Sequence, residues 1–231
     1  MIDWHSHLLP EIDDGSPDVE ESLALLRMEA EQGVDTVIAT PHFFANDGSV
    51  EDFIERRQRS YERLKNAMPE SFPNIVLGAE VRYYTGIGKL PELGKLCIGK
   101  SKLLLLEMPM EKWTDYTVRE LAGIARSGSV KLILAHIERY LSMQSESTWE
   151  RLYEAGITMQ VNASFFTGFT TKRTALSYLS KGSIHLIGSD CHNTKYRPPK
   201  LGEAYKTIRR KFGDEFVNQI NEYGEYLLKT K

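Results

Sequence analysis

The sequence has little cysteine and lacks both a long apolar run and a basic leader. Its only two cysteines, Cys97 and Cys191, do not make the disulfide framework of a small secreted fold. The apolar run Leu103–Leu106 is far too short to cross a bilayer. Met1 leads directly into Ile2, Asp3 and Trp4, without the pattern of a secretory signal. We therefore expect a cytoplasmic protein that does not insert into a membrane.

An excess of charge of one sign is also missing. The formal net charge is −3, so no broad basic field is available for nucleic acid or for an acidic membrane surface. The basic stretch IRRKFG (208–213) is interpreted as a helix end in water. With 231 residues, of which 41% are hydrophobic, the chain can bury a substantial core, and we expect one domain spanning 1–231.

Short apolar runs alternate with helical patterns along the whole chain. Ser16 is the predicted N-cap of the first helix, Pro17 its first residue, and Gly33 its end. The charged face of a helix over 50–67, which includes Arg57, is interpreted as solvated. Further helices are expected near 114–127, 146–155, 171–181 and 201–230. Seven strands are expected, at the N-terminus and at 36–40, 74–80, 102–107, 131–136, 157–162 and 183–190. This alternation predicts an α/β fold with a parallel sheet, open or closed.

Two histidines stand close together in the first strand. In MIDWHSHLLPEIDDG, His5 and His7 are two residues apart, so an extended strand points both imidazoles to the same side. Asp14, followed by Gly15, comes seven residues later. Taken alone, such a pair is more typical of two hydrogen-bonded histidines than of a metal site, and Asp14 alone is typical of a turn.

The other strands end in residues of the same chemical kind. In parallel α/β barrels the working residues gather at the carboxyl ends of the strands. Only the strand ending at Asn162 lacks a histidine or an acid, and His185, inside the last strand, is interpreted as structural. The candidate metal ligands are His5, His7, Asp14, His42, Glu80, Glu107, His136, Asp190 and His192. Singly, each histidine is more typical of a satisfied core residue and each acid of a salt bridge, but their joint placement favours a metal site.

Nine ligands are too many for one ion. Tetrahedral zinc takes four, so the set fits two or three divalent ions that share a carboxylate or a water. The mixture of imidazole and carboxylate, without thiolate, suits Mn, Fe or Zn. Closely spaced ions suit the hydrolysis of phosphate esters, since they lower the pKa of a bound water and hold phosphoryl oxygens.

The motifs resemble a known family. HxHxLPxxDDG, ATPH, GxE, LxE, HxER and SDxHN occur in this order and resemble the polymerase-and-histidinol-phosphatase (PHP) superfamily. More closely, they are similar to the bacterial manganese-dependent tyrosine-protein phosphatases of capsule and exopolysaccharide operons, the CpsB/CapC/YwqE group. The resemblance runs from His5 to about Tyr205. One departure is Ile137, where the family often has proline, but Glu138 and Arg139 follow in register.

The resemblance implies a fold, a centre and an activity. The fold would be a distorted (β/α)7 barrel of the PHP type, with a trinuclear metal centre, most simply of manganese, at the carboxyl ends of the strands. The nine residues given above would be its ligands. The activity would be hydrolysis of phosphotyrosine on a partner protein, a bacterial tyrosine kinase, by a metal-bridging hydroxide.

Two arginines are placed to neutralise a phosphoryl group. Arg139 follows His136 by three residues, and Arg197 follows His192 by five. Each alone could equally be a surface arginine, but with the resemblance we interpret both as catalytic phosphate clamps. Arg82, just after Glu80, is a weaker third candidate.

Two rival functions are compatible with the same sequence. Histidinol-phosphate phosphatase activity uses the same scaffold but would need a small pocket for an imidazole and an amine. A non-catalytic metal-binding or kinase-docking module is the second rival, and the complete ligand set argues against it. The sequence also contains a C-x5-R string from Cys191 to Arg197, typical of cysteine-dependent tyrosine phosphatases. We reject that mechanism because the string lacks glycine, and because Cys191 in a strand would point away from Asp190 and His192.

Overall fold

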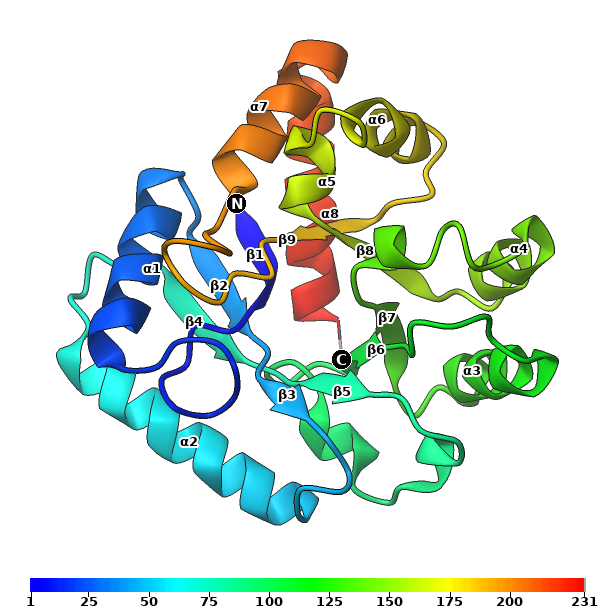
Figure 1. Cartoon of the computed structure of the whole chain (residues 1–231), viewed down its shortest axis with the longest axis horizontal. Coiled ribbons are helices and arrows are strands. Elements are labelled where there is room, and N and C mark those ends of the chain that lie inside the picture. The colour runs from blue at the N-terminus through cyan, green and yellow to red at the C-terminus, as the bar shows by residue number, and fades with distance from the viewer. Residues whose placement is uncertain (231) are drawn as a thin grey trace.

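The computed structural model describes residues 1–230, and its strands are all paired in parallel. Figure 1 shows them as a ring seen end on, with most of the helices outside it. The strand segments are β1 (Ile2–Ser6), β2 (Thr36–Ala39), β3 (His42–Phe43), β4 (Asn74–Leu77), β5 (Glu80–Arg82), β6 (Leu103–Glu107), β7 (Lys131–Leu134), β8 (Thr158–Asn162) and β9 (Leu186–Gly188). They pair as β1-β2-β4 and as β3-β5-β6-β7-β8-β9.

The two sheets are joined into one barrel. Ala39 pairs with Leu77 and His42 pairs with Glu80 at the same sequence offset, so β2 and β3 form one interrupted strand beside the interrupted strand β4–β5. Ser6 of β1 bridges to Cys191, three residues after the end of the last strand. If each interrupted strand is counted once, seven strands close the ring, and the predicted seven-stranded barrel is confirmed. The expected continuous strand 74–80 is wrong, because the strand stops at Leu77 and Glu80 begins the next segment.

The described residues form eight α-helices, most of which lie around the outside of the ring, while the last of them along the chain runs behind it (Figure 1). They are α1 (Val19–Glu31), α2 (Val50–Ala67), α3 (Asp115–Ser127), α4 (Glu146–Glu154), α5 (Ala163–Thr167), α6 (Lys172–Ser180), α7 (Leu201–Phe212) and α8 (Asp214–Lys229). Short 3-10 turns cover Ile87–Lys89, Leu93–Leu96 and Ile137–Arg139. None of these helices is both long enough and apolar enough to span a bilayer.

Two helix boundaries differ from the prediction. The N-cap of α1 is Asp18, whose carboxylate accepts from the backbone N–H of Glu21 at 2.8 Å, while the Ser16 hydroxyl donates to the Asp18 carbonyl. The expected helix 201–230 is two helices, because Gly213, with φ +88°, turns the chain between α7 and α8. The prediction that Gly33 ends α1 fits its φ of +81°.

In β2, β4, β6, β7 and β9, alternate residues face two different apolar cores. In β6, Leu103 and Leu105 belong to the inner core, whereas Leu104 and Leu106 belong to the core between the barrel and the helices. Leu227 of α8 packs into the inner core, so this helix covers one end of the barrel. Because apolar side chains and α8 fill one end of the barrel, polar side chains can gather only at the opposite end.

The charged face of α2 is not wholly solvated. Arg57 is buried, and its guanidinium donates to the carbonyl of Gly78 at 2.5 Å, at the interruption between β4 and β5. Its side chain also lies over the ring of Phe53. The expectation that Arg57 belongs to the solvated face is therefore wrong, because this face of α2 packs against the barrel.

Candidate metal centre

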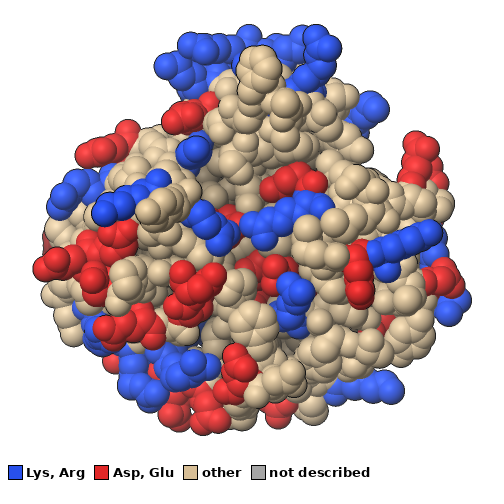
Figure 2. Space-filling view, in the orientation of Figure 1, with Lys and Arg blue, Asp and Glu red and all other residues tan. Residues whose placement is uncertain are grey.

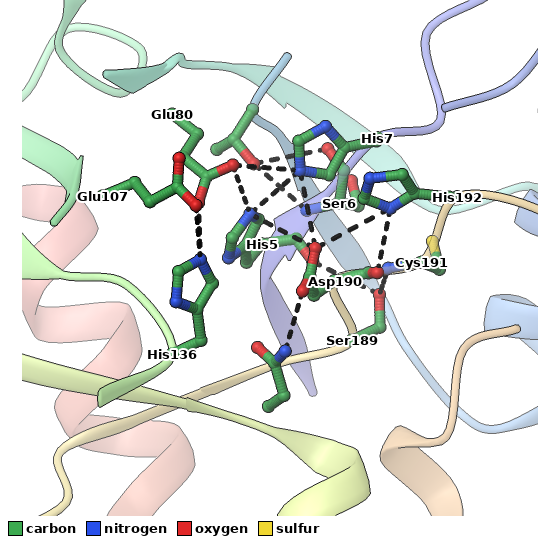
Figure 3. Close-up of polar contacts among 12 residues, drawn as sticks. His5, Ser6, His7, Glu80, Glu107, His136, Ser189, Asp190, Cys191 and His192 are labelled. Atoms are coloured by element: carbon green, nitrogen blue, oxygen red, sulfur yellow. Dashed lines mark hydrogen bonds and ion pairs between the residues drawn. The ribbon is translucent and has the colours of Figure 1, made fainter. Parts of the chain in front are cut away.

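All nine predicted ligands converge at the end of the barrel opposite the inner core. Figure 3 shows seven of them, His5, His7, Glu80, Glu107, His136, Asp190 and His192. Each belongs to at least one set of histidine and carboxylate atoms that lie within 4.8 Å of one another. The sets overlap, since His5, His7, His42 and Glu80 each belong to two of them. They are His7–Asp14–His42–His192, His5–His7–Asp190, His5–Glu80–His136 and His42–Glu80–Glu107.

The first strand presents its two histidines side by side, as expected. The Nε2 atoms of His5 and His7 are 3.0 Å apart. The outer nitrogen of His5 lies 3.3 Å from the side-chain oxygen of Gln160, and that of His7 lies 2.7 Å from Asp13. These contacts fix the ring orientations and leave both Nε2 atoms directed into the centre, which is how ligand histidines are commonly held.

Asp13 was missed by the sequence reasoning. Its carboxylate contacts His7 and also accepts from the backbone N–H of His42 at 3.0 Å. Burial opposes its ionisation, but the hydrogen bond and charge of His7 lower the pKa of Asp13 to about 2. The adjacent Asp14 instead points its oxygen to His42 and His192, at 3.4 Å from each. In the DDG motif, Asp13 therefore contacts His7 on the side away from the centre, whereas Asp14 contacts His42 and His192 within the ligand cluster.

Glu80 lies at the middle of the cluster. One carboxylate oxygen is 2.8 Å from Nε2 of His136, and the other is 3.3 Å from Nε2 of both His5 and His7. The second oxygen also lies 3.0 Å from Nδ1 of His42. Burial would raise the pKa of Glu80, but the surrounding histidines, His5 first, hold it well below its ordinary value. A single ionised carboxylate thus faces four imidazoles.

Two candidate ligands occupy unusual backbone conformations. His136 has φ +35° and Asp190 has φ +54°, a region that L-residues other than glycine rarely adopt. One oxygen of Asp190 lies 3.7 Å from His5 and 3.5 Å from His7. The other accepts from the side-chain amide of Asn162 at 2.7 Å. The strand that ends at Asn162 therefore serves the centre too, by holding Asp190 in place.

The centre fits a group of cations. Nδ1 of His42 and Nε2 of His192 are buried and make no aligned hydrogen bond among residues 1–230. Burial would lower the pKa of His5, but the carboxylates of Glu80 and Asp190 raise it above its ordinary value. The carboxylates thus favour positive charge at a point where buried imidazole lone pairs are free to coordinate.

The predicted arginines stand at the edge of this centre. Arg139 and Arg197 contact one oxygen of Asp190, at 2.5 and 2.8 Å. They line a cavity of about 210 Å³ with Asn162, Ser164 and Lys200. Arg82 lies 2.8 Å from Glu107. Figure 2 shows basic and acidic side chains facing one another around the hollow in this face. The arrangement can hold an anion against the cluster.

Cys191 points away from the centre, as expected for a strand neighbour of Asp190. Figure 3 shows its sulfur directed away from the ligand cluster. The sulfur lies with the carboxylates of Asp3 and Glu29, in a separate and fully buried group. Burial, followed by the charges of Glu29 and Asp3, raises the pKa of the Cys191 thiol well above its ordinary value. A reactive thiolate is not supported at this position.

Known proteins are similar to this chain in sequence and in fold. A family model described as "Capsular polysaccharide synthesis, CpsB/CapC" matches residues 1–225. The tyrosine-protein phosphatase CpsB of Streptococcus agalactiae serotype III is 31% identical over 235 residues, covering 95% of this chain and 94% of that protein. The tyrosine-protein phosphatase YwqE of Bacillus subtilis is 30% identical over 238 residues, covering 100% and 92%.

A solved structure shows the same fold. It comes from work on YwqE of Bacillus subtilis and CpsB of Streptococcus pneumoniae, described as unique metal-dependent tyrosine phosphatases. It superposes on this chain with a TM-score of 0.85 and 28% sequence identity, covering 100% of this chain and 95% of the other. The barrel described above is thus the fold of those enzymes.

Proposed function

Because the chain belongs to the CpsB/CapC family, we propose that it is a metal-dependent protein-tyrosine phosphatase. Its substrate is a tyrosine-phosphorylated protein, namely a bacterial tyrosine kinase of capsule or exopolysaccharide synthesis. The phosphatase acts in the cytoplasm. The observation that carries the proposal is the convergence of nine histidine and carboxylate side chains beside two arginines that share Asp190.

The proposed cofactor is two or three divalent ions, with manganese the first choice. The nine residues of the centre would hold these ions, with Glu80, which faces four histidines, in the middle of the set. Oxygen and imidazole donors without thiolate suit manganese or iron at least as well as zinc. When bound, such ions lower the pKa of a coordinated water and neutralise phosphoryl oxygens.

The chain's own residues bind and orient the phosphate ester. Arg139 and Arg197 place two positive charges beside the cavity, where they stabilise the charge on the phosphoryl oxygens during transfer. Asp190 holds both guanidinium groups, so little reorganisation is needed when the substrate binds. A tyrosine phenolate has a pKa near 10 and leaves without strong help from a general acid.

One experiment tests this proposal directly. The purified protein is analysed for metals, and hydrolysis of a phosphotyrosine peptide is measured before chelation, after chelation and after manganese is restored. We expect activity to disappear with the metal and to return with it. Full turnover by metal-free protein would contradict the proposal.

The two rival functions are separated by further substrates. Histidinol phosphate, assayed beside the peptide, identifies the alternative phosphatase if it is turned over faster. Phosphopeptide binding without turnover, unchanged by chelation, would instead support a non-catalytic docking module. We expect neither result.

A further inference from the structure

We propose that Phe44 is the platform on which the aromatic ring of the substrate phosphotyrosine lies. The enzyme would then bind aryl phosphate esters more tightly than alkyl esters such as phosphoserine, because only an aryl group packs on Phe44. This inference rests on the proposed function and concerns the substrate preference of the same site.

Two neighbouring phenylalanines follow the candidate ligand His42 and differ in surroundings. Phe43 is buried, and its ring centroid lies 5.3 Å from that of Phe53 in α2. Phe44 is 38% exposed, and its ring centroid lies 5.2 Å from that of His42 with an interplanar angle of 32°. Phe43 therefore anchors this segment in the core, while Phe44 presents an aromatic face beside the metal centre.

The exposed ring of Phe44 borders a cavity. The cavity has a volume of about 320 Å³, at the lower end of the range for small-molecule sites. It is lined by Ile12, Asp13, Asp14, His42, Phe44, Asp47 and Arg56. Ile12 and Phe44 supply apolar surface, two candidate ligands form the wall toward the centre, and the exposed Asp47 and Arg56 offer polar contacts to a polypeptide.

His192 connects this cavity with the one lined by Arg139 and Arg197, called the arginine cavity here. Nε2 of His192 lies 3.4 Å from Asp14, which lines the Phe44 cavity, and its Nδ1 lies 3.7 Å from Asp190, which lines the arginine cavity. A phosphate ester can thus place its phosphoryl oxygens toward Arg139 and Arg197 while its organic group enters the Phe44 cavity.

The chemistry of the organic group decides how well it fits there. Two aromatic rings attract each other in offset or tilted arrangements with centroids about 4.5–7 Å apart, beyond the effect of buried area. The ring of phosphotyrosine can pack on Phe44 in this way, whereas the short alkyl group of phosphoserine cannot reach it. From the usual strength of such ring pairs we expect a preference of roughly 3- to 10-fold from Phe44 alone.

The test measures binding of two inert phosphate analogues to the manganese-loaded protein by calorimetry. Phenylphosphonate carries the ring, and methylphosphonate carries only the anion. For Phe44→Ala we expect phenylphosphonate to bind roughly 3- to 10-fold more weakly and methylphosphonate to bind as in the wild type. Phe44→Tyr keeps the ring and should restore binding. Phe44→Leu keeps apolar bulk without a ring, so it should lose part of the preference for phenylphosphonate over methylphosphonate. It also provides a second variant in case Phe44→Ala does not fold.

A matched control is Phe169→Ala, which removes a fully exposed phenylalanine that borders a different cavity. It should leave both ligands unaffected. Equal weakening of both ligands in Phe44→Ala, or no change in phenylphosphonate, would overturn the role of Phe44. Failure of the proposed function is a separate result, namely a wild-type protein that binds phenylphosphonate through Phe44 but does not hydrolyse phosphotyrosine peptides.

Discussion

Ser189 donates two hydrogen bonds to the carboxylate of Asp3, one from its backbone N–H at 2.7 Å and one from its hydroxyl at 2.6 Å. Asp3 belongs to the first strand, and Ser189 directly follows the last. The Ser189 hydroxyl oxygen also accepts from the backbone N–H of Cys191 at 3.1 Å. These bonds fix the turn in which Asp190 adopts a positive φ, a conformation that costs about 1 kcal/mol or more in a residue other than glycine.

We therefore expect Asp3→Asn to weaken metal binding while the barrel stays folded. The amide replaces one of two acceptor oxygens, so at least one donor of Ser189 loses its partner and the turn that presents Asp190 is less well held. One oxygen of Asp3 also accepts from the backbone N–H of His5 at 3.2 Å, so the same change loosens the first strand at its ligand. A buried donor left without its acceptor costs about 1–3 kcal/mol, so the dissociation constant for manganese should rise by roughly fivefold or more. Metal titration measures this, and circular dichroism checks the fold.

Glu29→Gln is the matched control for this prediction. Burial and the neighbouring Asp3 raise the pKa of Glu29 well above its ordinary value, so glutamine imitates the neutral acid. Neither carboxylate oxygen of Glu29 has a hydrogen-bond partner in the described chain. We expect metal affinity like that of the wild type. An Asp3→Asn protein with unchanged affinity would show that Asp3 does not position the turn.

His5→Ala and His136→Ala should each abolish phosphotyrosine hydrolysis without unfolding the barrel. Both imidazoles contact Glu80 inside the cluster, whereas the apolar cores lie beneath and around it. Turnover and metal content are measured with manganese supplied. His185→Ala serves as the control, because His185 lies outside the cluster and accepts from the backbone N–H of Met159. Near-wild-type turnover by either ligand variant would contradict the assignment.

Arg139→Ala should retain its metal but lose about 100-fold or more in turnover, the loss typical when a group that stabilises transition-state charge is removed. Metal content should persist because Asp190 keeps its contacts with Arg197 and Asn162. Kinetics with a phosphotyrosine peptide and metal analysis measure the two properties. Arg151→Ala removes an exposed arginine paired with Asp115 and should change neither. Collapse of the metal content in Arg139→Ala would mean that Arg139 is structural.

Cys191→Ser should keep most activity, and thiol alkylation should inhibit far less than chelation. The thiol is fully buried, its pKa is raised well above the ordinary value, and it faces Asp3 and Glu29. Burying a hydroxyl in its place should lower the melting temperature before it lowers turnover. Loss of turnover in a folded, metal-loaded Cys191→Ser protein would restore the cysteine mechanism.

The sequence was sufficient to find residues whose placement follows from parallel strands alone. His5, Glu107 and His136 end or follow apolar runs, and the carboxyl ends of parallel strands share one edge. The same rule predicts the wrong local structure at Glu80. Gly78 and Ala79 continue the apolar pattern, so nothing in the sequence shows that hydrogen bonding as a regular strand stops after Leu77.

Features that depend on packing could not be read from local patterns. Ser16 and Asp18 are both good N-caps, and only the path of the chain decides which carbonyl and amide groups need a partner. Arg57 is one charge among many on α2, and its burial depends on a backbone carbonyl that arrives from the barrel. Asp13 and Asp14 are adjacent and chemically identical, so their different roles arise from the turn.

Barrel closure has a consequence for the order of folding. The first strand pairs with both its sequence neighbour and the segment after the last strand, where Ser6 bridges to Cys191. His5 and Asp190 therefore come together only when nearly the whole chain has been ordered, and contacts so distant in sequence form slowly because the intervening chain loses much entropy. Half-formed barrels hold an incomplete ligand set. High-affinity metal uptake during refolding thus reports closure of the ring rather than formation of its individual strands.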